Sequence, residues 1–99
     1  MESSEYRRRY AGFLERLRLA RVEAGLTQLE TSRLLNKPQS YVSKCEVGER
    51  RVDFVELLEF ARIYGKSISY FQQGVEVITD DMEIDSRQPA NVEEGESES

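Results

Sequence analysis

The chain has 99 residues, of which 33% are charged and 38% hydrophobic, and its formal net charge is −5. This length predicts one small domain, and this composition is typical of a globular protein. The sequence has no histidine and only one cysteine, Cys45, which excludes an internal disulfide framework. We find no imidazole base, activated nucleophile or glycine-rich phosphate loop, so we expect neither an enzyme nor a cofactor or metal site.

The charge is divided unevenly along the chain. Residues 1–73 hold 13 Lys and Arg against 10 Asp and Glu, whereas residues 74–99 hold one Arg against nine acids. We therefore expect a polar N-terminal arm over residues 1–9, a mildly basic domain over residues 10–73 and an acidic tail over residues 74–99. The tail has too few large apolar residues to offset its ordering entropy and is expected to be mostly disordered, with residues 75–78 as a possible dimer or docking segment.

The chain opens with a polar stretch that contains three consecutive arginines, residues 7–9. Two interpretations remain open for them: a basic arm that contacts a nucleic-acid backbone, or the solvated first turn of a helix. From about Tyr10 to Ala24, apolar residues recur at helical spacing, and Gly25 stands where a C-terminal cap belongs.

Residues 27–46 predict two short helices joined by a tight turn. Thr27 and Glu30 have the spacing of a capping box at the start of the first helix. Asn36 tolerates the left-handed conformation that reverses the chain, and Pro38 suits the start of the second helix. In the second helix, Val42 and Cys45 share the inward face. Four polar side chains point away from that face: Gln39, Ser40, Ser43 and Lys44.

Two further helices are expected after a loop over residues 47–51. Asp53 caps a helix whose apolar residues cover most of its circumference, and Gly65 ends it. Because of this apolar circumference, we expect that helix to form the centre of the core. Ser67 caps a last short helix over residues 68–72.

The stretch from about Phe13 to Phe71 resembles the Xre/Cro-type helix-turn-helix family of phage and bacterial transcriptional regulators. Thr27 and Gln28, the turn and the pattern V-S-K-x-E-x-G from Val42 all occur at the family's spacing. Three positions depart from the family's usual residues: Thr31 and Ser32 replace Leu-Ala, and Asn36 replaces Gly. The resemblance implies an all-α fold, a compact five-helix bundle of the lambda-repressor type.

The resemblance also implies roles for individual residues in binding double-stranded DNA. Base contacts fall to Gln39, Ser40, Ser43 and Lys44, side chains that can pair with base edges in the major groove. Phosphate contacts fall to Gln28, Tyr41, Arg50 and Arg51, although solvated surface charge is an alternative for the two arginines. Arg21 is expected to pair with Glu46 at the end of the second helix of the motif, the alternative being an ordinary exposed arginine.

The function expected from these features is sequence-specific transcriptional regulation, as a repressor. A single such unit reads few base pairs, so a homodimer is expected, with the last helix and residues 75–78 as candidate dimer surfaces. The alternative is an antitoxin-like or adapter module that binds a protein partner through its tail or its recognition helix. Without a signal peptide or a long apolar run, the chain is expected to be cytoplasmic, with no membrane partner.

Overall fold

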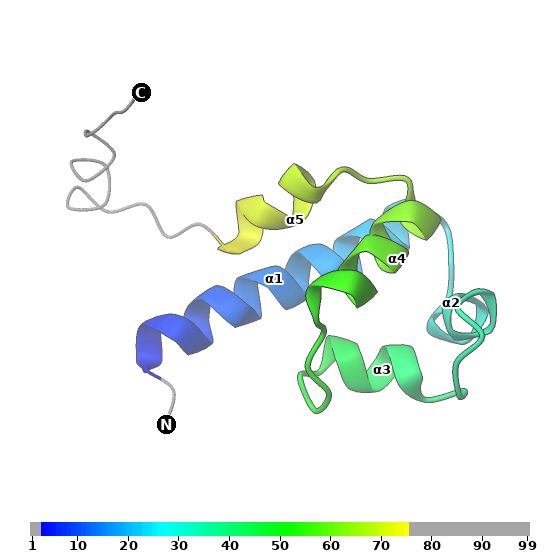
Figure 1. The fold of residues 1–99 in the computed structure, drawn as a ribbon, viewed down its shortest axis with the longest axis horizontal. Coiled ribbons are helices and arrows are strands. Elements are labelled where there is room, and N and C mark those ends of the chain that lie inside the picture. Colours follow the sequence, from blue (N-terminus) through cyan, green and yellow to red (C-terminus); the bar gives the residue numbers. More distant parts are fainter. Residues whose placement is uncertain (1–2, 76–99) are drawn as a thin grey trace.

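The computed structural model describes residues 3–75, and all regular secondary structure in this range is helical. The chain forms five helices in this range. Figure 1 shows the long α1 lying alongside α5, with α2 and α3 below α4 in this view. Their bounds are α1 (Ser4–Glu23), α2 (Gln28–Leu34), α3 (Tyr41–Glu46), α4 (Phe54–Tyr64) and α5 (Ile68–Val75). The expected all-α five-helix fold is confirmed. The residues expected to form the greater part of the tail, 76–99, lie outside the described range.

The first helix begins at Ser4 rather than near Tyr10. The Ser3 hydroxyl accepts the backbone N–H of Tyr6 at 3.0 Å, which caps the helix and satisfies one of its free donors. Arginines 7–9 therefore belong to α1, just after its first turn, and Arg9 is half-buried. The part of the expected arm from residue 4 onward is helical, and a nucleic-acid contact by these arginines stays a prediction.

Two of the N-caps expected from short-range spacing are present, at Thr27 and Asp53. Thr27 with Glu30 forms a complete capping box, and Asp53 forms another with Glu56. Asn36 takes the left-handed conformation at φ 59°, which turns the chain from α2 toward α3. Each of these features depends only on residues a few positions apart. The two capping boxes fix where α2 and α4 begin.

The core lies where α1, α3, α4 and α5 meet. Phe60 of α4 is fully buried, and its ring lies 6.1 Å from Tyr41 and 5.7 Å from Tyr64. The other buried apolar residues are Phe13, Leu17, Ala20, Val42, Cys45, Ala61 and Phe71. Phe60, Ala61 and Tyr64 thus place α4 in the core as expected, but Phe54, Val55 and Leu58 remain exposed.

Close backbone contact joins α5 to α1. A Cβ atom on Gly12 would overlap the carbonyl oxygen of Gly74, so both positions need glycine. Arg9 Nε donates to the Val75 carbonyl at 3.1 Å, and Arg16 Nε donates to another α5 carbonyl at 2.9 Å. Arg9 satisfies the last carbonyl of α5, whereas Arg16 binds the Tyr70 carbonyl in its first turn. The helix extends to Val75 rather than ending at residue 72.

Candidate nucleic-acid interface

A buried hydrogen bond fixes α3 against α2. Thr31 and Ser32, the two polar residues at positions where the family usually has Leu-Ala, are both fully buried. Ser32 Oγ accepts the backbone N–H of Val42 at 3.1 Å, and Thr31 Oγ1 donates to the Thr27 carbonyl at 3.0 Å. Val42 N–H lies in the first turn of α3, where no carbonyl within the helix can accept it. The polar substitution at Ser32 therefore satisfies a donor that would otherwise be buried without a partner.

A shielded ion pair holds the other end of α3. Arg21 Nε lies 2.6 Å from Glu46 Oε2 and Nη2 lies 3.2 Å from Oε1, while the two side chains are only 14% and 4% exposed. Arg21 Nη1 also donates to the Leu26 carbonyl at 3.0 Å. The hydrogen bond to Glu46 raises the pKa of the Arg21 guanidinium above its usual value. The expected partnership of these two residues is thus present, and it links α1 to the last residue of α3.

Gln28 completes this network. Its Nε2 donates to Glu46 Oε1 at 2.9 Å, and the residue is half-buried. One of the amide donors expected to meet a phosphate is therefore used inside the protein, and a phosphate contact by Gln28 stays a prediction. The spacing between Gln28 and Glu46 gave no signal of this contact, because it depends on how α2 crosses α3.

Tyr41 was expected on the DNA-facing surface, and its position corrects that expectation. Its side chain is 6% exposed, stacked on Phe60, with the hydroxyl oxygen enclosed, so it does not reach a phosphate in this conformation. Burial raises the pKa of the Tyr41 hydroxyl. The sequence did contain a signal for this placement. Tyr41 lies four residues before Cys45, so the two share the inward face of α3.

The polar side chains expected to read bases divide between the turn and the helix. Because α3 begins at Tyr41, Gln39 and Ser40 lie in the preceding turn, and both are exposed. Lys44 is exposed on α3 itself, while Ser43 is half-buried and its Oγ donates to the Ser40 carbonyl at 3.1 Å. Gln39, Ser40 and Lys44 thus have solvent-facing hydrogen-bonding groups on one rigidly held segment.

Three cations surround a shallow hollow beside these residues. Lys37, Lys44 and Arg50 line it, together with Pro38, Ser40 and Tyr41, and its volume is about 300 Å³. Lys37 Nζ lies 5.2 Å and Arg50 Cζ 4.9 Å from the centre of the Tyr41 ring. The buried tyrosine therefore contributes indirectly, as an aromatic face that positions two cations. Lys37 was not among the expected contact residues, although its place directly before Pro38 puts it in the turn.

Arg50 and Arg51 are exposed as expected, but both are held by other side chains. Arg50 Nη2 lies 2.7 Å from Glu56 Oε2, a contact that lowers the pKa of the Glu56 carboxyl and raises that of Arg50. Arg51 Nη1 donates to the Tyr6 hydroxyl at 3.1 Å, and its Cζ lies 4.4 Å from the centre of the Tyr10 ring. Both arginines therefore have a defined direction at the edge of the polar surface.

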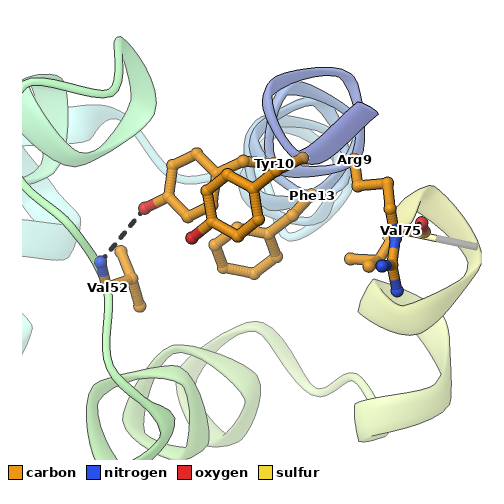
Figure 2. Close-up of a pocket in the computed structure, with 6 residues that line it drawn as sticks. Arg9, Tyr10, Phe13, Val52 and Val75 are labelled. Atoms are coloured by element: carbon orange, nitrogen blue, oxygen red, sulfur yellow. Dashed lines mark hydrogen bonds between the residues drawn. The ribbon is translucent and has the colours of Figure 1, made fainter. Parts of the chain in front are cut away.

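The loop that contains these arginines is fixed to α1. Figure 2 shows Tyr10 directed toward Val52, whose backbone N–H donates to the Tyr10 hydroxyl at 3.1 Å. Tyr10 also lines an apolar hollow of about 280 Å³ with Phe13, Val52 and Val75, and with Tyr6 and Arg9 at its edge. Partial burial raises the pKa of the Tyr10 hydroxyl. The Tyr10 contact makes the loop part of the same rigid unit as α1.

No other chemistry stands out in the described part of the chain. Among residues 3–75, no group of three or more His, Cys, Asp or Glu side chains is placed to hold a metal ion. None of the helices in that range has the length and apolar character needed to cross a bilayer. Cys45 is fully buried, and this burial raises the pKa of its thiol, so the reactive thiolate form is disfavoured.

Comparison with known proteins bears directly on this surface. A family model described as helix-turn-helix, of the Xre/Cro-like type, matches residues 17–71. The match extends from Leu17 in α1 to Phe71 in α5 and so contains α2, α3 and α4 entirely. Among curated proteins, none matches the chain.

Proposed function

Since the chain belongs to the Xre/Cro-like helix-turn-helix family, we propose that it is a sequence-specific regulator of transcription that binds double-stranded DNA as a homodimer. The observation that carries this proposal is the exposed row formed by Gln39, Ser40 and Lys44, supported from behind by buried contacts. Family membership by itself indicates a DNA-binding regulator. Reading of the major groove, dimerisation and repression are our proposals.

In this proposal the segment from Gln39 to Glu46 enters the major groove. The Gln39 amide can both donate to and accept from adenine, and the Lys44 ammonium can donate to guanine. The Ser40 and Ser43 hydroxyls can pair with either type of base edge. Discrimination between bases needs donors and acceptors held in fixed positions, and the bonds at the two ends of α3 meet that need.

Phosphate contacts come from the cations at the edge of the same surface. Lys37, Arg50 and Arg51 are the candidates, because each is already directed by an aromatic ring or a carboxylate. Prior ordering lowers the entropy lost when a long side chain binds. Residues 1–73 have a net charge of +3, which supports a DNA-binding role that the net charge of the whole chain obscures.

The proposed homodimer follows from the small size of the reading surface. One α3 of six residues covers only a few base pairs, so two copies on adjacent half-sites are needed for useful specificity. Repression is assigned on the family resemblance, and a reporter gene downstream of the bound site tests it. Higher reporter output without the protein supports repression, and lower output would make the protein an activator.

The alternative of a protein-binding adapter rests mainly on the acidic tail. Residues 76–99 lie outside the described range, so a partner for the tail remains a prediction. Cytoplasmic location is likewise a proposal that accompanies the regulatory role.

The test is to select bound sites from random double-stranded DNA, and then to measure affinities for the selected site and its single-base variants at several salt concentrations. Gln39→Ala should cost about 1–3 kcal/mol at one base position and relax preference there. Arg50→Ala should weaken all sites alike and reduce the salt slope by about one. Arg18→Ala is the matched control, because Arg18 is an exposed arginine on α1 paired with Glu15.

The outcomes separate the possible roles. If Gln39→Ala weakens every site equally, Gln39 does not read a base. If no selected sequence emerges and none of the variants changes DNA binding, the proposed function is wrong and the adapter role gains support.

A further inference from the structure

Three large apolar side chains are exposed together at the start of α4. Phe54, Val55 and Leu58 are 63%, 64% and 44% exposed. Residues separated by three and four positions lie next to one another on a helix, so the three form one continuous patch. The other large apolar residues with high exposure in the described range lie on α1, α2 and the loop after α3: Tyr6, Val22, Leu34 and Val47. A continuous apolar patch on the surface of a small domain marks an interaction site.

The core contacts of α4 do not account for this patch. Phe60, Ala61 and Tyr64 are the buried residues of α4 and pack in the core. Val55 and Leu58 lie on a different side of the helix from Phe60 and Tyr64, and Phe54 is exposed in the first turn. Arg62 follows Leu58 by four residues and is exposed on the same side. Within residues 3–75, Arg62 has no ion-pair partner.

We infer that this face of α4 is the surface on which a second copy of the chain docks. This inference rests on the proposed function, in which the regulator is a homodimer. The two α4 helices pack antiparallel across a two-fold axis at Leu58, which contacts Leu58 of the partner subunit. A two-fold axis makes the same patch serve both copies, so the patch must complement itself. In this arrangement Phe54, four residues before the axis, lies opposite Arg62 of the partner subunit, four residues after it.

The order of side chains along α4 selects the antiparallel arrangement. In a parallel pair, Arg62 would lie beside Arg62 of the partner subunit, and like charges at an interface are unfavourable. In an antiparallel pair, each guanidinium meets an aromatic ring, and a cation over such a ring is attracted by its negative face. Each Arg62 guanidinium also lies within one residue of the level of Asp53 of the partner subunit. The order Phe54, Leu58, Arg62 along one α4 is therefore complementary to the same order read backwards along the other.

The competing dimer surface is already partly occupied. The last helix was one candidate, but α5 packs on α1 through the Gly12 and Gly74 contact, and Arg9 and Arg16 bind its carbonyls. Phe71 of α5 is 1% exposed. The α4 patch has no such intramolecular cover, because its three apolar residues remain exposed.

The first test measures the association of the full-length chain in sedimentation equilibrium without DNA. The wild-type chain should be dimeric, and Leu58→Glu should raise the dimer Kd by about 30-fold or more, because two carboxylates would meet at the axis. Val22→Glu is the matched control, since Val22 is 51% exposed on α1 and lies outside the patch. It should leave the Kd unchanged. A wild-type chain that stays monomeric at its highest soluble concentration overturns the proposal, as does a Leu58→Glu chain that dimerises normally.

The second test uses the position of Leu58 on the axis. A cysteine there faces its own copy, so Leu58→Cys should form a disulfide-linked dimer under mild oxidation. Cys45 does not compete because it is fully buried. Val22→Cys should form no disulfide-linked dimer under the same conditions, because Val22 lies outside the patch. Absence of cross-linking in Leu58→Cys, with circular dichroism showing an intact helical fold, contradicts the antiparallel arrangement.

Failure of the proposed interface can be distinguished from failure of the proposed function, because neither test uses DNA. The Leu58→Glu monomer keeps Gln39 and Lys44 intact and should still bind a single half-site weakly. If the chain dimerises through α4 but selects no DNA sequence, the interface stands and the proposed function falls. If it selects DNA while Leu58→Glu leaves the dimer intact, the proposed function stands and the interface is wrong.

Discussion

Replacing Glu46 with alanine should destabilise the protein by about 3 kcal/mol. The carboxylate accepts three hydrogen bonds: from Arg21 Nε at 2.6 Å, from Arg21 Nη2 at 3.2 Å and from Gln28 Nε2 at 2.9 Å. Breaking a fully buried pair costs about 3–5 kcal/mol, because it leaves a charge buried without its partner. Arg21 remains 14% exposed and keeps its bond to the Leu26 carbonyl, which places the expected cost at the low end of that range.

Urea unfolding followed by far-UV circular dichroism measures this loss. The midpoint should fall while the slope stays unchanged, since the surface exposed on unfolding is nearly the same. A loss of this size is a large fraction of the stability of a small domain, about 5–15 kcal/mol. DNA affinity should fall with it, because Glu46 anchors the end of α3.

The matched control is an exposed ion pair in the same molecule. Arg18 and Glu15 lie 3.1 Å apart, but their side chains are 47% and 56% exposed, so Glu15→Ala should cost less than about 1 kcal/mol. A second comparison replaces the whole pair with apolar residues. Arg21→Met combined with Glu46→Leu should be more stable than Glu46→Ala, since no buried charge is left alone. The reasoning is refuted if Glu46→Ala costs no more than Glu15→Ala.

Three further outcomes test the supports of the interface. Ser32→Ala should cost about 1–3 kcal/mol and speed hydrogen exchange at the Val42 amide, which loses its buried acceptor; unchanged protection would contradict this. Glu56→Gln keeps the cap but loses the ion pair with Arg50. Because the folded pKa of Glu56 is lowered, its contribution is present above the unfolded value of 4.5 and is lost as the pH falls below it. The Tm difference from wild type should therefore shrink in acid, and a constant difference would argue against the pair. Gly12→Ala should cost about 1–3 kcal/mol and make α5 sensitive to limited proteolysis, because the new methyl group overlaps an α5 carbonyl oxygen; wild-type resistance would contradict the close contact.

The sequence by itself determined the local features of this fold. The capping box at Thr27, the left-handed turn at Asn36 and the cap at Asp53 are present as expected. Capping and turn conformation depend on hydrogen bonds between residues two to four positions apart, so adjacent residues are enough to specify them. The exposure of Lys44 followed in the same way from its place relative to the inward residues of α3, whereas Gln39 is exposed in the turn before that helix.

Only the tertiary structure decided which polar groups remain on the surface. Gln28 is turned inward by Glu46, and Tyr41 is covered by Phe60. Arg51 is held by Tyr6, 45 residues earlier in the chain. Each of these contacts joins residues on different elements, and its geometry depends on helix crossing that no short stretch of sequence encodes. The polar character of a side chain thus predicted hydrogen bonding, while the packing of the helices chose the partner.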